Sequence, residues 1–198
     1  MITSVSGAPV VVLGVVVLVA GLLLAVVEAG AVVGPVRPVV MVALTLAAGL
    51  VIGALFILPF LLFSATSGQL TDKYDKTKMI RFVKNLEIGI MLLAAYGFYA
   101  DQVPVLLVCT FLMGVHSTLF GPVKFAYLPQ VLSERELTGG NGMVEMGTFV
   151  AILLGNVAGG LLIALPEIGA KTVGIGCIAM AVLGRAVAWY VPASPATD

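Results

Sequence analysis

A short charged stretch, Gly68 to Lys78, lies between two apolar runs that are each long enough to cross a membrane. These runs cover residues 39–67 and 82–100, and a helix needs roughly 20 apolar residues to cross the hydrocarbon core of a bilayer. The whole chain is equally apolar, since 61% of its 198 residues are hydrophobic, 10% are charged and the mean hydropathy is +1.17. Soluble domains carry about 25% charged residues. The sequence therefore predicts an integral membrane protein.

Four further apolar runs raise the number of predicted spanning helices to six. The connections between the runs are short, so no separate soluble domain fits among them. The sequence thus predicts an all-α membrane protein with six transmembrane helices. The predicted spans are residues 8–27, 39–67, 82–100, 103–120, 141–165 and 172–191.

Basic residues gather at one end of the predicted helices. The connection after the second helix and the one after the fourth hold most of them, whereas the opposite connections hold only Arg37 and Lys171. In membrane proteins the excess of Lys and Arg lies in the cytoplasmic loops. The pattern therefore predicts that these two connections and both termini are cytoplasmic. The basic residues concerned are Lys73, Lys76, Lys78, Arg81, Lys124 and Arg135.

The first 54 residues differ in composition from the rest of the chain. Fifteen of the residues from Val10 to Val42 are valine, and no aromatic residue precedes Phe56. No Lys or Arg precedes Arg37, and the apolar run is longer than that of a signal peptide, so a spanning helix is favoured over a cleaved signal. We therefore divide the chain into an atypical hydrophobic region (1–54), a body (55–191) and a short tail (192–198).

Four polar side chains share one stripe of the fifth predicted helix. On a helical wheel, Asn141, Glu145, Thr148 and Asn156 fall within an arc of about 80°. A charged residue inside a spanning helix costs about 2.5 to 3.5 kcal/mol on insertion scales, so it normally faces a bundle interior or a watery cavity. Glu145 is therefore the leading functional candidate, and the alternative is a structural carboxylate near the cytoplasmic end of the helix.

Lys124 is the second candidate. It follows Gly121-Pro122, where the fourth helix is predicted to end and where a bend can aim the ammonium group at the mouth of a cavity. The alternative is an interfacial lysine whose ammonium reaches out to lipid phosphates.

Three local patterns predict contacts or helix ends. Lys84 and Glu87 are spaced i, i+3 and can pair on one helix face. The segment Ser133-Glu134-Arg135-Glu136 matches a capping box, so a helix is expected to begin there. Arg185 in the sixth helix fits either a buried charge pair or a residue that reaches out to the membrane surface, and the sequence does not decide between them.

No pattern for catalysis, a metal or a cofactor is recognisable in the sequence. It has no Ser with a nearby His and acid and no phosphate-cradling loop after a strand. His116 is the only histidine, and Cys109 and Cys177 lie in predicted helices, as is typical of small buried residues. Ten basic residues balance ten acidic ones, which argues against a nucleic-acid partner. We expect a protein that is not an enzyme and needs neither metal nor cofactor.

The charged stretch resembles the signature loop between the second and third helices of the major facilitator superfamily. That loop reads Gly, three residues, Asp, a basic residue, any residue, Gly and then further basic residues. Asp75 stands where the second glycine is expected. The resemblance implies a loop that gates conformational change, formed here by Gly68, Asp72, Lys73, Lys76 and Lys78.

Three other segments, residues 56–60, 121–130 and 141–155, are similar to the lysophospholipid transporter branch of that superfamily. This branch includes the transporter domain fused to 2-acylglycerophosphoethanolamine acyltransferase and acyl-carrier-protein synthetase modules. The resemblance covers Leu55 to Val191. It implies a carrier that moves lysophospholipids, mainly lysophosphatidylethanolamine, across the bacterial inner membrane for reacylation. It also implies that Lys124 and Glu145 engage the head group, and we expect Asn141 and Thr148 to line the same site.

The sequence departs from the branch in two ways. The acidic residue that the branch carries in its first helix has no counterpart between Ala8 and Val27, which suggests a misplaced start or a shifted reading frame. The superfamily also builds its cavity between two six-helix halves. We therefore expect the N-terminal half of a transporter, which works with a second six-helix half or another copy, and an acyltransferase is a further candidate partner.

Two alternative functions stay open at this point. The first is a membrane module that anchors or presents substrate to an acyltransferase without transport of its own. The second is a carrier for another small solute, such as a drug or a sugar.

Overall fold

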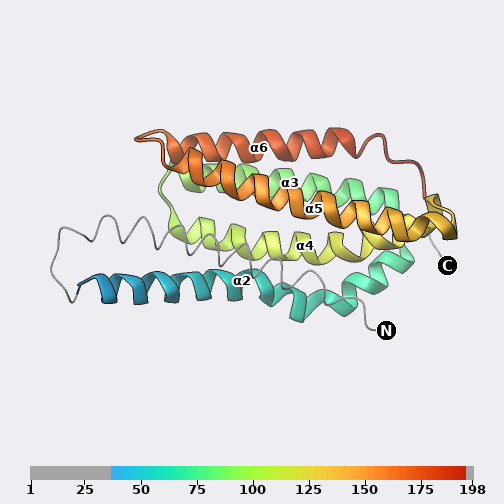
Figure 1. The fold of residues 1–198 in the computed structure, drawn as a ribbon, viewed down its shortest axis with the longest axis horizontal. Helices are drawn as coiled ribbons and strands as arrows, with labels where there is room; N and C mark the ends of the chain where they lie inside the picture. Colours follow the sequence, from blue (N-terminus) through green and yellow to red (C-terminus); the bar gives the residue numbers. More distant parts are fainter. Residues whose placement is uncertain (1–36, 195–198) are drawn as a thin grey trace.

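The computed structural model describes residues 37–194, with side chains described from Val42 onward. All regular structure in this range is helical, and the five helices lie alongside one another (Figure 1). This confirms the all-α fold. The first predicted helix, residues 8–27, lies outside the described residues. The helices are α2 (Arg37–Lys73), α3 (Lys76–Tyr99), α4 (Val103–Val131), α5 (Glu134–Ile163) and α6 (Gly169–Val187).

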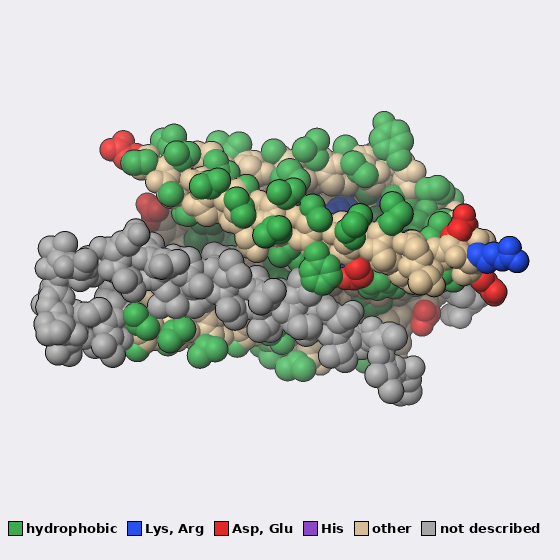
Figure 2. Space-filling view, viewed as in Figure 1, with side chains coloured by type: hydrophobic (Ala, Val, Ile, Leu, Met, Phe, Trp, Pro, Cys, Tyr) green, Lys and Arg blue, Asp and Glu red, His purple; other side chains and the backbone are tan. Residues whose placement is uncertain are grey.

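Four of these helices, α2, α4, α5 and α6, are long and apolar enough to cross a membrane. The helix α3 has 24 residues, but Lys84, Asn85 and Glu87 interrupt its apolar sequence. Figure 2 shows hydrophobic side chains spread along the visible surface of α5 and α6, and most of the visible charged side chains lie toward the ends of the molecule. The described residues thus have the surface of a multi-pass membrane protein, as the sequence predicts.

The charged stretch is mostly helical, and its assignment as a loop is wrong. The helix α2 continues to Lys73, α3 begins at Lys76, and only Tyr74 and Asp75 connect them. The side chain of Asp75 caps α3 by accepting a hydrogen bond from the backbone nitrogen of Lys78 at 3.0 Å. The charged residues at the start of α3 can therefore be helical, because the Asp75 side chain satisfies a backbone N–H that has no partner within the helix.

The fourth helix also extends beyond its predicted end. It continues through Pro122 and Pro129 to Val131, so the predicted end at Gly121-Pro122 is wrong. A proline removes one backbone hydrogen bond, but tertiary packing holds the helix together here, since Val123 is fully buried.

The capping box at Ser133 is confirmed, and α5 begins at the next residue. The Glu136 carboxylate accepts hydrogen bonds from the backbone nitrogen of Ser133 at 3.1 Å and from its hydroxyl at 2.6 Å. The helix therefore starts at Glu134, earlier than the predicted span at residue 141.

Small and polar residues line the contact between α2 and α4. A Cβ atom at Gly114 would overlap the Phe56 carbonyl oxygen, so only glycine allows this approach. The Ser67 hydroxyl donates to the Thr118 carbonyl at 2.7 Å across the same contact. Pro59 is fully buried here, and α2 bends near the start of its second half (Figure 1), where a proline removes a backbone hydrogen bond.

The helix α3 packs against both α4 and α6. Ile80, Val123 and Ala188 form one buried cluster among these three helices, and Ile90, Ala94 and Cys109 form another between α3 and α4. By contrast, α5 has no buried residue. The core of the described residues therefore lies around α3 and α4, and α5 contributes no buried residue to it.

The segment after α6 returns to the start of α3. The Thr77 hydroxyl donates to the Pro192 carbonyl at 2.6 Å, and the backbone nitrogen of Lys76 donates to the Ser194 carbonyl at 3.2 Å. Residues 192–194 of the predicted tail are therefore docked against the bundle.

Candidate functional site

The two leading candidates lie together between α4 and α5. The Lys124 ammonium nitrogen is 3.3 Å from a carboxylate oxygen of Glu145. Their side chains are 21% and 33% exposed, so the pair is accessible from the surface of the described residues. The ammonium also lies 4.7 Å from the ring centroid of Phe125. Because α4 continues past Pro122, Lys124 projects from a helix rather than from a loop.

The other residues of the polar stripe are less closely involved. Thr148 is half-buried, and its hydroxyl donates to the Val144 carbonyl at 2.8 Å within α5. Asn141 is exposed and Asn156 is half-buried. In the part of the chain that the structure describes, no hydrogen bond joins Asn141 or Thr148 to Lys124. The described geometry thus centres the site on one lysine and one glutamate.

This pair presents a cation and an anion side by side at an accessible position. Ionised groups form hydrogen bonds roughly twice as strong as neutral ones. A ligand that carries both an anionic and a cationic group can therefore replace the internal contact with two contacts of its own. No covalent chemistry follows from this arrangement, and no three His, Cys, Asp or Glu side chains gather as a possible metal site within the described range.

The five signature residues lie at the helix ends around Tyr74 and Asp75. Gly68 is half-buried, and a Cβ atom there would meet no atom of the described chain within 4 Å. Among the other four, Asp72, Lys73 and Lys78 are exposed, whereas Lys76 is only 1% exposed.

A second charged cluster lies between α3 and α4. The predicted pair forms, with the Lys84 ammonium 2.7 Å from Glu87 Oε2, and His116 Nε2 lies 3.4 Å from the same oxygen. Phe120 completes the cluster, because its ring stacks near His116 and lies 5.2 Å from the Lys84 ammonium. The sequence revealed the local pair but not the histidine, which only the packing of α4 on α3 brings close.

Arg185 has a neutral partner in the described chain. Its Nε donates to the side-chain oxygen of Asn85 on α3 at 2.6 Å, and its guanidinium lies 5.1 Å from the ring of Trp189. No carboxylate pairs with it among residues 42–194. This contact could not be predicted from the sequence, because Asn85 and Arg185 are 100 residues apart.

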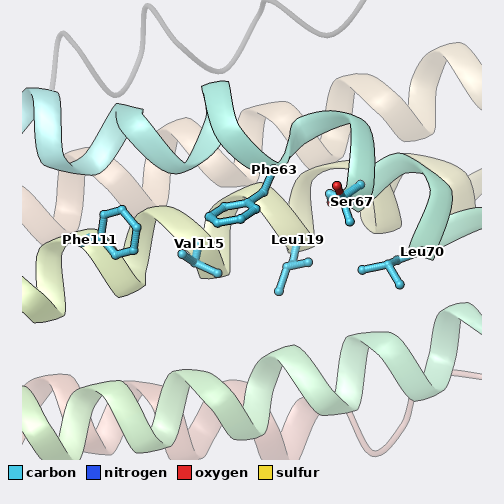
Figure 3. Close-up of a pocket in the computed structure, with 7 residues that line it drawn as sticks. Phe63, Ser67, Leu70, Phe111, Val115 and Leu119 are labelled. Carbon is cyan, nitrogen blue, oxygen red and sulfur yellow. The ribbon is translucent and has the colours of Figure 1, made fainter.

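One small cavity lies between α2 and α4, with side chains from both helices around it (Figure 3). Its volume of about 230 Å³ is below the range of roughly 300–1,000 Å³ that is usual for ligand pockets. The cavity does not include Lys124 or Glu145. Its lining residues are Phe63, Thr66, Ser67, Leu70, Phe111, Val115 and Leu119.

Comparison with known proteins places the chain in a family. The family model of the major facilitator superfamily matches residues 29–198, which is most of the chain. No solved structure matches.

Several curated relatives are called lysophospholipid transporter LplT. The protein from Serratia proteamaculans is 28% identical over 141 residues, which is 71% of this chain and 33% of the relative. The one from Escherichia fergusonii is 29% identical over 143 residues, or 72% of this chain and 34% of the relative. The one from Yersinia enterocolitica is 30% identical over 107 residues, or 54% and 25%. The matches thus span about a third or less of these relatives. Because the family model matches most of the chain, and because the described residues form a bundle of apolar helices, this chain belongs to the major facilitator superfamily.

Proposed function

We propose that this chain is part of a carrier that moves lysophospholipids, chiefly lysophosphatidylethanolamine, across the bacterial inner membrane for reacylation. The observation that carries this proposal is the contact between Lys124 and Glu145 at 3.3 Å. The head group of lysophosphatidylethanolamine has a phosphate anion and an ammonium cation. Lys124 binds the phosphate and Glu145 binds the ammonium, with Asn141 and Thr148 on the same stripe of α5. The names of the relatives supply the substrate class.

The energetics favour exchange of partners. A partly exposed ion pair contributes only about 0–1 kcal/mol, so separating Lys124 from Glu145 costs little. A hydrogen bond to a charged group contributes about 1.5–3 kcal/mol, and the head group offers two of them. The acyl chain stays among apolar side chains or in the surrounding lipid, because its exposure to water is unfavourable.

A second six-helix half, or another copy of this chain, completes the carrier in this proposal. In support, α5 has no buried residue, and both α2 and α5 expose large apolar side chains such as Leu61 and Leu161. Faces of this kind are covered by another element or by lipid. The partner helix approaches at Gly68, where the described chain leaves open space, and Asp72 meets the positive N-terminal end of that helix. The signature residues Lys73, Lys76 and Lys78 flank this contact and gate the change of conformation.

The proposed orientation places the α2–α3 and α4–α5 connections and both termini in the cytoplasm. It rests on the bias of basic residues toward these connections. Lysophospholipid delivered to that side can be reacylated there, and an acyltransferase is the expected partner for this step.

The proposal is tested by measuring uptake of radiolabelled lysophosphatidylethanolamine into spheroplasts that express the protein from its whole gene. Lys124→Ala and Glu145→Ala should each lower uptake more than tenfold, since a hydrogen bond between the head group and a charged side chain contributes about 1.5–3 kcal/mol. Arg135→Ala, on an exposed basic residue of α5 outside the signature stretch and the Lys124–Glu145 pair, should change uptake little and serves as the control.

The outcomes separate the alternative functions. Near-normal uptake by both site variants at normal expression would reject the assignment of Lys124 and Glu145. Absence of uptake by the wild type, with reacylation of added lysophospholipid intact, would favour a module that serves an acyltransferase. Uptake of a drug or sugar without lipid uptake would favour another carrier.

A further inference from the structure

Two arginines at the end of the bundle that holds the α2–α3 connection lack an acidic partner among the described side chains. Arg81 of α3 donates from Nη2 to the Trp189 carbonyl at 3.3 Å, and Arg185 of α6 donates from Nε to Asn85. Neither guanidinium forms an ion pair with any of residues 42–194. Each retains its positive charge, and one buried nitrogen of each, Arg81 Nε and Arg185 Nη1, has no hydrogen-bond partner among the described residues.

The same tryptophan lies against both arginines. The guanidinium carbons of Arg81 and Arg185 are 5.9 Å and 5.1 Å from the Trp189 ring centroid. Trp189 and the adjacent Tyr190 are 68% and 86% exposed, just beyond the end of α6. Exposed Trp and Tyr at the ends of spanning helices are typical of the membrane–water interface, where lipid phosphates also lie.

An apolar strip leads from the arginines toward the middle of the bundle. On α3, Ile88 and Leu92 follow Arg81 at the same helical face, by their spacing of seven and eleven residues. On α6, Val182 precedes Arg185 by three residues; Val182 and Leu92 are exposed, and Ile88 is half-buried. Basic groups at the surface end and apolar side chains below them match the two parts of a phospholipid.

We propose that Arg81, Arg185 and Trp189 bind the head group of an anionic phospholipid, whose acyl chain lies along α3 and α6. The phosphate accepts hydrogen bonds from the two guanidinium groups, and the indole ring holds both of them in place through cation–π contacts. A lipid fits better than free phosphate because the apolar strip continues into the membrane region. This site lies on α3 and α6, apart from Lys124 and Glu145, and does not depend on the transported substrate.

The chain carries its own probe for this site, because Trp189 is its only tryptophan. The purified 198-residue chain is reconstituted into phosphatidylcholine nanodiscs that contain increasing fractions of phosphatidylglycerol brominated near the head group, and quenching of Trp189 fluorescence is followed. A parallel series uses phosphatidylcholine brominated at the same carbons. We expect phosphatidylglycerol to quench at a much lower mole fraction than phosphatidylcholine.

Each basic residue near an anionic surface contributes about 1 kcal/mol. Removal of one arginine should therefore weaken the preference for phosphatidylglycerol over phosphatidylcholine about fivefold, and removal of both about thirtyfold. The variants are Arg81→Gln, Arg185→Gln and their combination. The double variant Arg81→Lys with Arg185→Lys should keep part of the preference, since charge remains while the planar donor arrangement is lost.

The matched control is Lys171→Gln. Lys171 also makes a cation–π contact, with Tyr99 at 5.4 Å, but it lies at the opposite end of the bundle. This variant should leave quenching unchanged. Helical circular dichroism and a single elution peak identify variants that remain folded, and the lysine double variant keeps the test decisive if the glutamine variants unfold.

Three results would overturn the proposal. They are equal quenching by the two lipids in the wild type, an unchanged preference in the folded double glutamine variant, and full displacement of the brominated lipid by inorganic phosphate. The last result would identify a site for a free anion rather than for a lipid.

Discussion

The Lys124 ammonium and the Glu145 carboxylate approach to 3.3 Å across the contact between α4 and α5. These residues are 21 positions apart in sequence, and each is the other's only ionic partner among the described residues. In the absence of a ligand the two charges therefore neutralise each other, and a bound zwitterion has to separate them.

This relationship predicts how the site discriminates between head groups. Glu145→Gln removes the proposed partner of the ligand ammonium, Glu145, but leaves Lys124, the proposed partner of its phosphate. Uptake of lysophosphatidylethanolamine should fall more than tenfold, since a hydrogen bond to a charged group is worth about 1.5–3 kcal/mol. Uptake of lysophosphatidylglycerol, which has no ammonium group, should fall much less.

Competition between the two labelled lipids in the same spheroplast preparation measures this ratio. Lys124→Gln is the comparison, because both head groups contain phosphate and both should lose uptake. Equal losses for the two lipids in Glu145→Gln would contradict the proposed role of Glu145.

Gly114→Ala tests the contact between α2 and α4. The added Cβ atom overlaps the Phe56 carbonyl oxygen, so the helices have to separate. We expect the free energy of unfolding to fall by about 1–3 kcal/mol, as is typical of overpacking. Thermal melting of the purified chain in detergent measures the change.

Gly121→Ala is the matched control on the same helix, because a Cβ atom there meets nothing within 4 Å. This variant should be neutral or slightly stabilising, since alanine favours the helix over glycine by about 1 kcal/mol. If both variants melted at the same temperature, the close approach would have no energetic role.

Glu87→Gln tests the charged cluster between α3 and α4. The change leaves the Lys84 ammonium without its anion and removes the carboxylate near His116. The glutamine oxygen can still accept from Lys84, but a neutral hydrogen bond is about half as strong as a charge-assisted one, so we expect a loss of stability of about 1 kcal/mol. Glu134→Gln, on an exposed residue of α5, should leave the melting temperature unchanged, and a similar loss in both variants would argue against the cluster.

Cysteine labelling tests the proposed orientation. In a background without Cys109 and Cys177, a cysteine at Lys78 or Arg135 should react only with a reagent that reaches the cytoplasm, because both positions are exposed at the basic end. Lys76 is unsuitable since the structure buries it. Reaction of position 78 with an impermeant maleimide in intact cells would contradict the proposed orientation and indicate the opposite one.

Local patterns predicted much of the fold. Apolar runs of about 20 residues predicted the helices in the described part of the chain, because the bilayer sets the length of a spanning segment. The capping box at Ser133 and the pair of Lys84 and Glu87 were also correct, since both depend on residues only three positions apart. The extent of α2 and α4 was wrong, because caps and tertiary packing rather than hydrophobicity decide where those helices end.

The sequence by itself determined that this is a helical membrane protein and which polar residues lie inside its helices. Only the tertiary structure decided which of those residues meet. Lys124 meets Glu145, His116 joins Glu87, and Trp189 lies near both Arg81 and Arg185, because α3, α4, α5 and α6 pack side by side. The physical reason is that helical periodicity fixes the face of each residue but not the neighbouring helix, which depends on packing between segments far apart in sequence.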